Sequence, residues 1–375
     1  MRTKKILVIP HFPGEEIRVR EKEIALHLAE YYEVYYLYWR QPEDRNITER
    51  FKSLLSNIFQ PTSFRKKGKI WYLRISCIPT PRAIAKIFNK ISLSRLFRRI
   101  SFDVVINASF LFPVKKEPHH RYFVDLVDLP VENWQDKLGT YMLKFYEEEV
   151  LKADKVFVVS ESLGEIISEK FNCKTIFLPN GTNINFFRNV MKEDVSKLRT
   201  RLGLEGKEIL GAVGNWGEWM NLPFLLKVFG EFKKGHKNAA LVLVGPGPEV
   251  SKYKNEAIDD SVIFVGSVRP DNIEKYFLLF DLAILPNKKT LWQDVAFHIK
   301  LVEYTAARKM VVSTPLREVL NLGFPNVIAV EHDVEKWIDA IEKGLNITWN
   351  PDWDLLVEHF DWRNILECVV GWIEE

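Results

Sequence analysis

The sequence has few of the residues that build disulfide frameworks and metal sites, and it has no long apolar run. Its 375 residues include only three cysteines, at positions 77, 173 and 368. Their wide spacing predicts neither disulfides nor a metal site, and a reducing cytosol is the expected environment. No apolar stretch approaches the roughly 20 residues that a membrane-spanning helix needs. The apolar start "KILVIP" (5–10) is too short for a signal peptide and predicts a first strand.

Acidic residues are missing from one long segment. Residues 51–102 contain 12 Lys or Arg and no Asp or Glu, although the whole chain has a net charge of only +3. Such a segment predicts an anionic partner, and the mixed basic and apolar "SRLFRRI" favours an interfacial helix on an anionic membrane. We therefore expect a cytoplasmic protein, peripheral at the inner face of the membrane. No nucleic-acid motif accompanies the charge, so nucleic acid is not the expected partner. The alternative is a solvated basic face over ordinary core residues.

Short apolar, β-branched runs alternate with longer amphipathic stretches along the whole chain. Near-continuous apolar strands indicate burial on both faces, which is typical of parallel sheets covered by helices. The first series comprises residues 5–10, 33–39, 69–76, 103–109, 121–128, 155–160 and 175–180. The second comprises residues 208–214, 239–245, 262–266, 282–286, 310–314 and 326–331. Two series in one chain of this length predict an α/β protein with two Rossmann-like domains.

Several of these predicted strands end in Gly, Pro or Asn, including Asn180, Gly214 and Gly266. Ligands of open α/β sheets bind beyond the carboxyl ends of the strands, where glycine lets a backbone come close to a ligand. Taken singly, each of these residues also fits an ordinary turn. Two such domains predict a cleft between their facing strand ends.

An ordered set of motifs resembles the retaining glycosyltransferases of family 4, which have the GT-B fold. The motifs are "DKVFVVSESL" (154–163), "FLPNGTNINFF" (177–187), "GAVGNWGEWMNL" (211–222), "LVLVGPGPE" (241–249), "VIFVGSV" (262–268), "AILPNKKTLWQDVAFHIKLVEYTAARKMVVSTPLREV" (283–319) and "FDWRNIL" (360–366). The resemblance implies an acceptor-side domain (1–185), a nucleotide-sugar domain (186–355) and a C-terminal helix (356–375) that packs back on the first domain. The "EW" and "K-L-x-E-Y" elements resemble a subgroup that acts in surface-polysaccharide assembly.

Lys300 and Glu303 lie three residues apart, which makes them neighbours on one face of a helix. The resemblance implies that Glu303 binds the ribose hydroxyls of the donor nucleotide, since a carboxylate accepts two hydrogen bonds. The donor pyrophosphate is expected near the start of this helix, around residues 295–299, with Lys300 adding a positive charge. The alternative is an ordinary surface ion pair.

The sequence departs from the common family pattern at two places. Val295 stands where the family usually has a first glutamate, the residue that contacts the transferred sugar. The loop after the first strand of the donor domain lacks the usual arginine and lysine, and carries Gly217, Glu218 and Trp219 instead. We expect Glu218 to bind sugar hydroxyls and Trp219 to stack on a sugar or base; the alternative for Trp219 is packing under the loop.

In the first domain, Gly14 occupies the position of a family loop that approaches the donor phosphates or the acceptor. Asp128 ends a predicted strand where the family often has an active-site histidine, and Asp125 precedes it. We expect Asp128 to act on the sugar or acceptor in the cleft, by orienting the acceptor or stabilising positive charge. Capping of a turn is the alternative. His119 and His120 are expected to be loop residues.

These expectations combine into one function. The resemblance implies a hexosyl- or other glycosyltransferase that moves a sugar from a nucleoside diphosphate sugar to a glycan or polyprenyl-linked acceptor. It implies a retaining, metal-independent reaction without a cofactor. Two alternatives remain open: a nucleotide-sugar epimerase of the same fold, and a catalytically degenerate subunit that binds nucleotide sugar within a membrane assembly complex.

Overall fold

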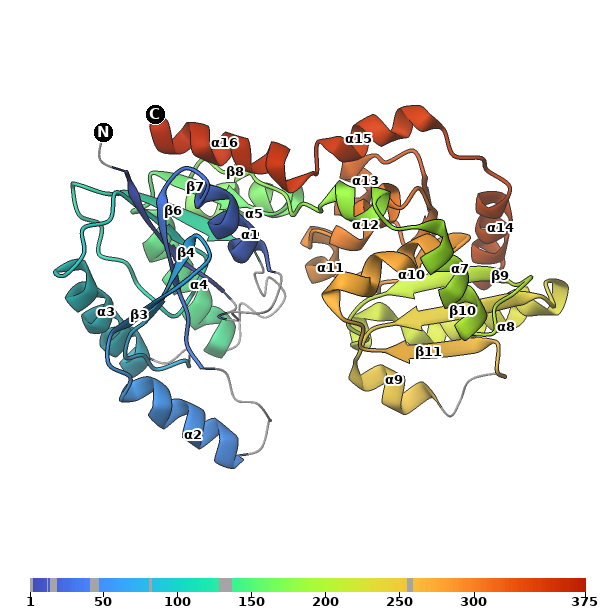
Figure 1. Cartoon of the computed structure of the whole chain (residues 1–375), viewed down its shortest axis with the longest axis horizontal. Coiled ribbons are helices and arrows are strands. Elements are labelled where there is room, and N and C mark those ends of the chain that lie inside the picture. The colour runs from blue at the N-terminus through green and yellow to red at the C-terminus, as the bar shows by residue number, and fades with distance from the viewer. Residues whose placement is uncertain are drawn as a thin grey trace. The chain divides into compact units, whose positions relative to one another are not determined.

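A computed structural model describes residues 3–11, 13, 19–40, 47–80, 83–127, 137–254 and 259–375 (Figure 1). The chain divides into two compact units. The first comprises Met1–Pro179 and Ile365–Glu375, and the second comprises Asn180–Asn364. Within the described ranges, no helix has the length and apolar character needed to cross a membrane.

The first unit is built on an eight-stranded sheet in the order β3-β4-β2-β1-β5-β6-β7-β8. Its elements are β1 (Lys5–Ile9), α1 (Arg20–Leu28), β2 (Glu33–Leu37), α2 (Ile47–Ile58), β3 (Ser63–Lys67), β4 (Ile70–Arg74), α3 (Ala83–Phe97), β5 (Val104–Asn107), β6 (Arg121–Leu126), α4 (Lys137–Val150), β7 (Lys155–Val158), α5 (Glu161–Phe171) and β8 (Ile176–Phe177). Neighbouring strands are parallel except for the β3–β4 pair at one edge.

The second unit is built on a six-stranded parallel sheet in the order β11-β10-β9-β12-β13-β14. Its strands are β9 (Glu208–Val213), β10 (Ala239–Val244), β11 (Val262–Gly266), β12 (Leu282–Leu285), β13 (Met310–Ser313) and β14 (Val327–Ala329). Its α-helices are α6 (Ile184–Arg188), α7 (Lys192–Arg201), α8 (Leu222–Gly235), α9 (Pro248–Tyr253), α10 (Ile273–Leu279), α11 (Leu291–Val295), α12 (Ile299–Ala306), α13 (Arg317–Leu322), α14 (Val334–Leu345) and α15 (Asp354–Glu358), with short 3-10 turns at Glu218–Met220, Pro270–Asn272 and Pro351–Trp353.

Buried strands and capped helices explain why the sequence forms these layers. Every residue of β10 is buried, because helices cover both faces of the sheet. Asp333 caps the N-terminus of α14, because its side chain accepts a hydrogen bond from the Lys336 N–H (3.0 Å). The helix buries Trp337 in the core. The two sheets, parallel except for the β3–β4 pair, confirm the predicted α/β protein with two Rossmann-like domains.

The C-terminal helix α16 (Trp362–Glu374) packs on the first unit, as expected (Figure 1). The Trp372 ring stacks on Phe157 of β7 at 5.2 Å, and Lys4 forms an ion pair with Glu374 at 2.8 Å. Residues 356–364, which we assigned to this helix segment, fall in the second unit. Arg308, which follows α12, forms an ion pair with Asp354 of α15 and holds that region to the second sheet.

Candidate functional site

The carboxyl edge of the six-stranded sheet carries the candidate site. Strand order reverses beside β9: β10 lies on one side of it and β12, much later in the chain, lies on the other. Ligands of open parallel sheets bind outside the carboxyl ends at such a point. The candidate site therefore comprises the loops that follow β9 and β12, together with α12.

Glycines allow the backbones at these strand ends to pack closely. Gly214 N–H donates to the Val244 carbonyl (3.0 Å), and Gly245 N–H donates to the Gly266 carbonyl (2.8 Å). Gly245 has φ +115°, and a Cβ there would overlap the Gly214 carbonyl oxygen. Gly266 also has a positive φ, +76°. These glycines therefore let neighbouring strand ends pack backbone against backbone, and the close approach of a ligand to them stays a prediction.

The loop after β9 is anchored by Trp216, whose side chain is fully buried and donates its indole N–H to the Val244 carbonyl (3.2 Å). The backbone N–H of Trp216 donates to the Pro246 carbonyl (2.7 Å). The half-buried Trp219 ring covers Gly217, where a Cβ would collide with it. The same ring meets Trp292 edge-on at 5.6 Å. Trp219 thus packs over this loop, and its stacking on a sugar or base stays a prediction.

Glu218 projects from this loop with its side chain 82% exposed, and its carboxylate lies 2.9 Å from the Lys288 ammonium. The hydrogen bond from Lys288 lowers the pKa of the Glu218 carboxyl. The backbone N–H of Lys288 also donates to the Trp219 carbonyl (2.8 Å). The loop after β12 therefore brings a cation to the β9 loop, which has none of its own.

Lys300 and Glu303 lie on α12 with Nζ and Oε2 2.6 Å apart, and their side chains are 29% and 18% exposed. The next residue, Tyr304, is buried, and its hydroxyl accepts a hydrogen bond from the Val213 N–H (2.9 Å) at the end of β9. This bond fixes α12 beside the glycine edge. The ion pair that we considered as the alternative is present, and it leaves part of each polar group accessible to a ligand.

The turn before α12 is largely buried. Val295 is only 3% exposed, so the side chain at this position has little surface to offer a sugar. His298 is buried and its Nε2 donates to the Gln293 carbonyl (2.9 Å); burial lowers the pKa of this imidazole and favours the neutral form. Nearby, the Asn287 amide donates to Gln293 Oε1 (2.6 Å), while the buried Asn287 Oδ1 has no partner among the described residues.

In the first unit, Asp125 of β6 is fully buried and forms an ion pair with Arg20 of α1. The guanidinium binds both carboxylate oxygens, at 2.9 to 3.2 Å, and also donates to the Pro179 carbonyl at 2.8 Å. This arrangement gives Asp125 a structural role in joining helix to sheet. Gly14 and Asp128 lie outside the described residues, and Asn180 is half-buried at the start of the second unit.

Sequence reasoning missed several polar residues at the carboxyl edge. Lys288 and Lys289 follow β12, Thr314 follows β13, and His332 lies just beyond β14. His332 Nε2 is 3.0 Å from Thr314 Oγ1, and Lys289 Nζ is 3.5 Å from a Glu331 carboxylate oxygen. The strand-end rule that singled out the glycines applies equally to these residues, so the signal was available.

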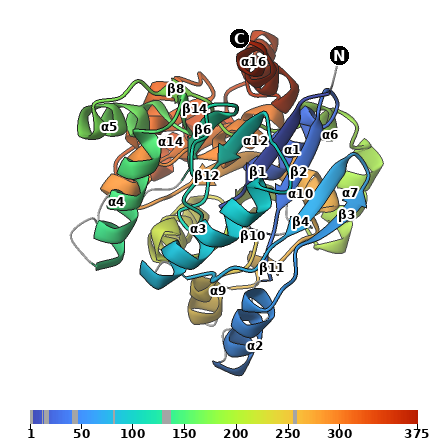
Figure 2. The same ribbon diagram turned by 90° about the vertical axis from the view of Figure 1, so that its left-hand side faces the viewer.

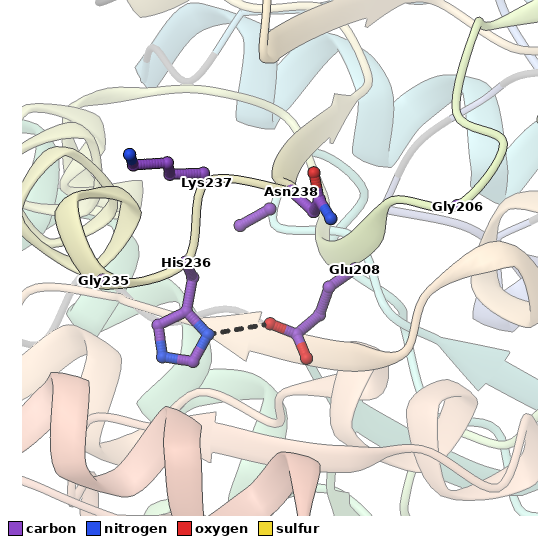
Figure 3. Close-up of a pocket in the computed structure, with 7 residues that line it drawn as sticks. Gly206, Glu208, Gly235, His236, Lys237 and Asn238 are labelled. Carbon is purple, nitrogen blue, oxygen red and sulfur yellow. Dashed lines mark ion pairs between the residues drawn. The ribbon is translucent and has the colours of Figure 1, made fainter.

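A hollow lies at the amino edge of the six-stranded sheet, at the opposite ends of the strands from the candidate site (Figure 3). It has a volume of about 520 Å³ and is lined by Glu208, His236 and their neighbours. His236 bridges two carboxylates, Glu208 at 3.3 Å and Glu342 at 3.2 Å. Across the described ranges, no group of three or more His, Cys, Asp or Glu has a geometry that would hold a metal.

Comparison with known proteins finds a family match within the second unit. Residues 207–346 match the model of the family described as "Glycosyl transferases group 1". The alpha-monoglucosyldiacylglycerol synthase of Streptococcus pneumoniae is 27% identical over 139 residues, which are 35% of this chain and 32% of that protein. TuaH of Bacillus subtilis, named as a teichuronic acid biosynthesis glycosyltransferase, is 26% identical over 258 residues, which are 62% of this chain and 63% of that protein.

The fold comparison covers both units. Sucrose-phosphate synthase from Thermosynechococcus elongatus superposes with a TM-score of 0.76 at 14% identity, covering 99% of this chain and 98% of that one. The chain spans about a third and just under two thirds of the two curated relatives. The two Rossmann-like sheets are those of the GT-B fold, and residues 207–346 match the glycosyl transferases group 1 model.

Proposed function

We propose that the protein transfers a sugar from a nucleoside diphosphate sugar to a glycan or lipid-linked acceptor, with retention and without a metal. The observation that carries this proposal is the position of the Lys300–Glu303 pair. It lies on α12 within the family-matched segment, and Tyr304 ties that helix to the end of β9. Partly exposed opposite charges beside a glycine-rich strand edge suit a ligand that carries both phosphate and a ribose diol.

In this proposal the donor separates the two charges of the pair. Lys300 moves to the pyrophosphate, and the Glu303 carboxylate accepts hydrogen bonds from both ribose hydroxyls. Lys288 supplies the cation that the β9 loop lacks, and Glu218, once released from it, binds sugar hydroxyls. The N-terminal N–H groups of α12 face the phosphates.

The proposed transfer breaks the bond between the anomeric carbon and the phosphate oxygen, and the electron pair leaves with the nucleoside diphosphate. The acceptor oxygen bonds to the same face of the sugar, and its proton passes to the leaving phosphate. Asp128 orients the acceptor or stabilises the developing positive charge. The cations at the donor phosphates stabilise the departing negative charge.

The acceptor class stays broad. One relative is named for a glucosylated diacylglycerol and the other for teichuronic acid, so a lipid and a glycan both remain in the proposal. We also propose an anionic membrane surface as partner of residues 51–102, with the protein at the cytoplasmic side of that membrane. The charge of this segment supports the assignment.

A degenerate nucleotide-sugar-binding subunit is the second candidate. The buried Val295 side chain favours it, since this position offers no carboxylate to the transferred sugar. An epimerase of the same fold would bind the same donors without an acceptor. The three functions differ in what happens to the donor: transfer and slow hydrolysis, binding alone, or inversion at one sugar carbon.

The test is thermal unfolding of the full chain against a panel of nucleoside diphosphate sugars. A ligand at about 100 times its dissociation constant stabilises by about 2.7 kcal/mol, which gives a clear shift. The best ligand then enters a donor-hydrolysis assay with the wild type and Asp128→Asn. We expect the variant to bind nucleoside diphosphate normally but to turn over slowly.

Other outcomes reject parts of the proposal. No shift with any nucleotide sugar rejects a donor site altogether. Binding without hydrolysis or transfer favours the degenerate subunit, and an epimerised donor favours the epimerase. If Asp128→Asn turns over normally and loses about 1 kcal/mol of stability, Asp128 caps a turn instead.

A further inference from the structure

Two helices of the first unit, α2 and α3, expose rows of large apolar side chains. A helix on a soluble protein ordinarily buries its apolar stripe against the core. In α2 the buried residues are polar, and in α3 the buried face combines Asn89 and Ser92 with Ala85, Leu93 and Leu96. The exposed rows form an apolar surface that the described residues of the unit leave open to solvent.

In α2, the buried polar residues are Ser53 and Asn57, which bind the backbone carbonyl of Arg40 at 2.8 and 2.9 Å. Phe51 is 60% exposed and Phe59, just after the helix, is 77% exposed. Ile47 and Leu55 extend the same exposed stripe at spacings of four residues. Hydrogen bonds thus fix the polar face inward, and the apolar face must point outward.

In α3, the buried Asn89 binds the N–H and C=O of Ile78 (2.8 and 3.0 Å) and the carbonyl of Leu111 (3.0 Å). Ile84, Ile87 and Ile91 are 69%, 63% and 47% exposed. Their i, i+3, i+7 spacing places them in one row on the opposite side of the helix. Most of the surface of Ile84 and Ile87, and about half of that of Ile91, therefore stays in contact with solvent.

The two helices accept hydrogen bonds from two adjacent residues of the segment between them, Cys77 and Ile78. The Asn57 carbonyl accepts a hydrogen bond from Cys77 N–H (3.0 Å), and Asn89 Oδ1 accepts one from the N–H of Ile78. Both helices lie at the outside of the first unit, α3 at its left and α2 at its lower end in Figure 1, and Figure 2 shows them from that left-hand side. We call the exposed sides of these two helices the docking face.

Unpaired cations continue the docking face along α3. Lys90, Arg95, Arg98 and Arg99 are exposed, and none forms an ion pair within the described part of the chain. Arg95 extends the row of isoleucines by one turn of α3, and Arg98 and Arg99 follow directly after the helix ends at Phe97. The whole segment 51–102 contains no acidic residue to compensate them.

We propose that the docking face inserts into the interface of an anionic lipid membrane. The Phe and Ile side chains enter the acyl boundary, while the Lys and Arg groups bind lipid phosphates. A second copy of this chain fits the surface poorly, because a symmetric contact would set the same cations against each other. Nucleic acid would use the cations but leave the apolar row exposed.

This inference deepens the proposed function, and rests on it for one point only: a lipid-linked acceptor would be reached at the membrane. Binding to lipid does not itself require sugar transfer. The two ideas can therefore fail separately.

The experiment is co-sedimentation of the full chain with vesicles of phosphatidylcholine alone and of phosphatidylcholine with phosphatidylglycerol, over a salt series. We expect binding to the anionic vesicles, weakening as salt screens the cations. One variant replaces Ile84, Ile87 and Ile91 with Gln, and should bind at least about tenfold more weakly at every salt concentration. A second replaces Arg95, Arg98 and Arg99 with Glu, and should lose more than about 100-fold, since each cation contributes about fivefold.

The matched control replaces three exposed apolar residues elsewhere, Leu151, Met191 and Leu355, with Gln. It should bind vesicles like the wild type. All variants should keep the wild-type melting temperature and the same thermal shift with nucleoside diphosphate, which shows that the units are folded.

Several results would overturn the inference. These are no vesicle binding by the wild type, equal binding to neutral and anionic vesicles, or equal loss in the control variant. A dimer in solution that the isoleucine variant abolishes, without vesicle binding, would assign the face to a second copy. Vesicle binding by a chain that binds no nucleotide sugar would keep the docking face and reject the proposed transfer.

Discussion

Glu303→Ala separates the two readings of the Lys300–Glu303 pair. As an ion pair alone, it is a partly exposed i, i+3 contact of the kind that contributes only about 0.3–0.5 kcal/mol to stability. As a ribose ligand, Glu303 accepts hydrogen bonds to a charged group, which contribute roughly 1.5–3 kcal/mol each. The variant should therefore lose tenfold or more in nucleotide affinity, at about 1.4 kcal/mol for each factor of ten, while its stability changes little.

The chain offers a matched control in α8. Glu231 and Lys234 have the same i, i+3 spacing and the same 2.6 Å separation, far from the carboxyl edge of the sheet. Glu231→Ala should cost a similar amount of stability and leave nucleotide affinity unchanged. The assay is calorimetric titration with nucleoside diphosphates, beside urea unfolding of each variant.

One result would refute the reasoning. If Glu303→Ala and Glu231→Ala bind nucleoside diphosphate as tightly as the wild type, the pair is only structural. A large loss of stability in Glu303→Ala alone would show that the carboxylate supports the fold, and affinity would then be compared with Glu303→Gln, which keeps the size of the side chain.

Three further predictions concern the stability of the fold at Asp125, Glu21 and Gly245. Asp125→Ala should destabilise by about 3–5 kcal/mol in urea unfolding, because it leaves the buried Arg20 charge uncompensated; a stable, inactive variant would instead place Asp125 in catalysis. Burial raises the pKa of Glu21 from 4.5 to about 7, so the unfolded chain loses this proton first and stability falls as pH rises through that window. Relative to wild type, Glu21→Gln should therefore gain up to about 3 kcal/mol between pH 4.5 and pH 7.5, and an unchanged difference would contradict the shift. Gly245→Ala should destabilise by about 3 kcal/mol or more because its Cβ overlaps the carbonyl oxygen of the β9 loop, whereas Gly203→Ala, at φ +66° in open space, should lose only about 1 kcal/mol; equal losses would contradict the close packing.

The strands were predictable because a strand that is buried on both faces appears in the sequence as a short, continuous apolar run. Each apolar run that we expected to be a strand is one, in both sheets. The exception is β3 (Ser63–Lys67), whose residues are all exposed and mostly basic. The sequence feature that could have predicted β3 is Gly68. It lies in the two-residue loop before β4 with φ +60°, which lets the chain turn into an antiparallel hairpin.

The partners of charged residues were not predictable from the sequence. The spacing of Lys300 and Glu303 showed that they share a helix face, because that contact is local. Glu218 and Lys288 are 70 residues apart, and Arg20 and Asp125 are 105 apart. Only the assembled sheets bring such groups within hydrogen-bond distance.

The sequence by itself determined the α/β class, the two series of strands and the glycine-rich carboxyl edge, because each follows from short-range patterns of burial and turn formation. The tertiary structure alone decided which side of α2 and α3 is buried. Helical periodicity says which residues share a face, but the hydrogen bonds of Asn57 and Asn89 to distant backbone select the face that turns inward. That choice left the isoleucines and phenylalanines of these helices in contact with solvent.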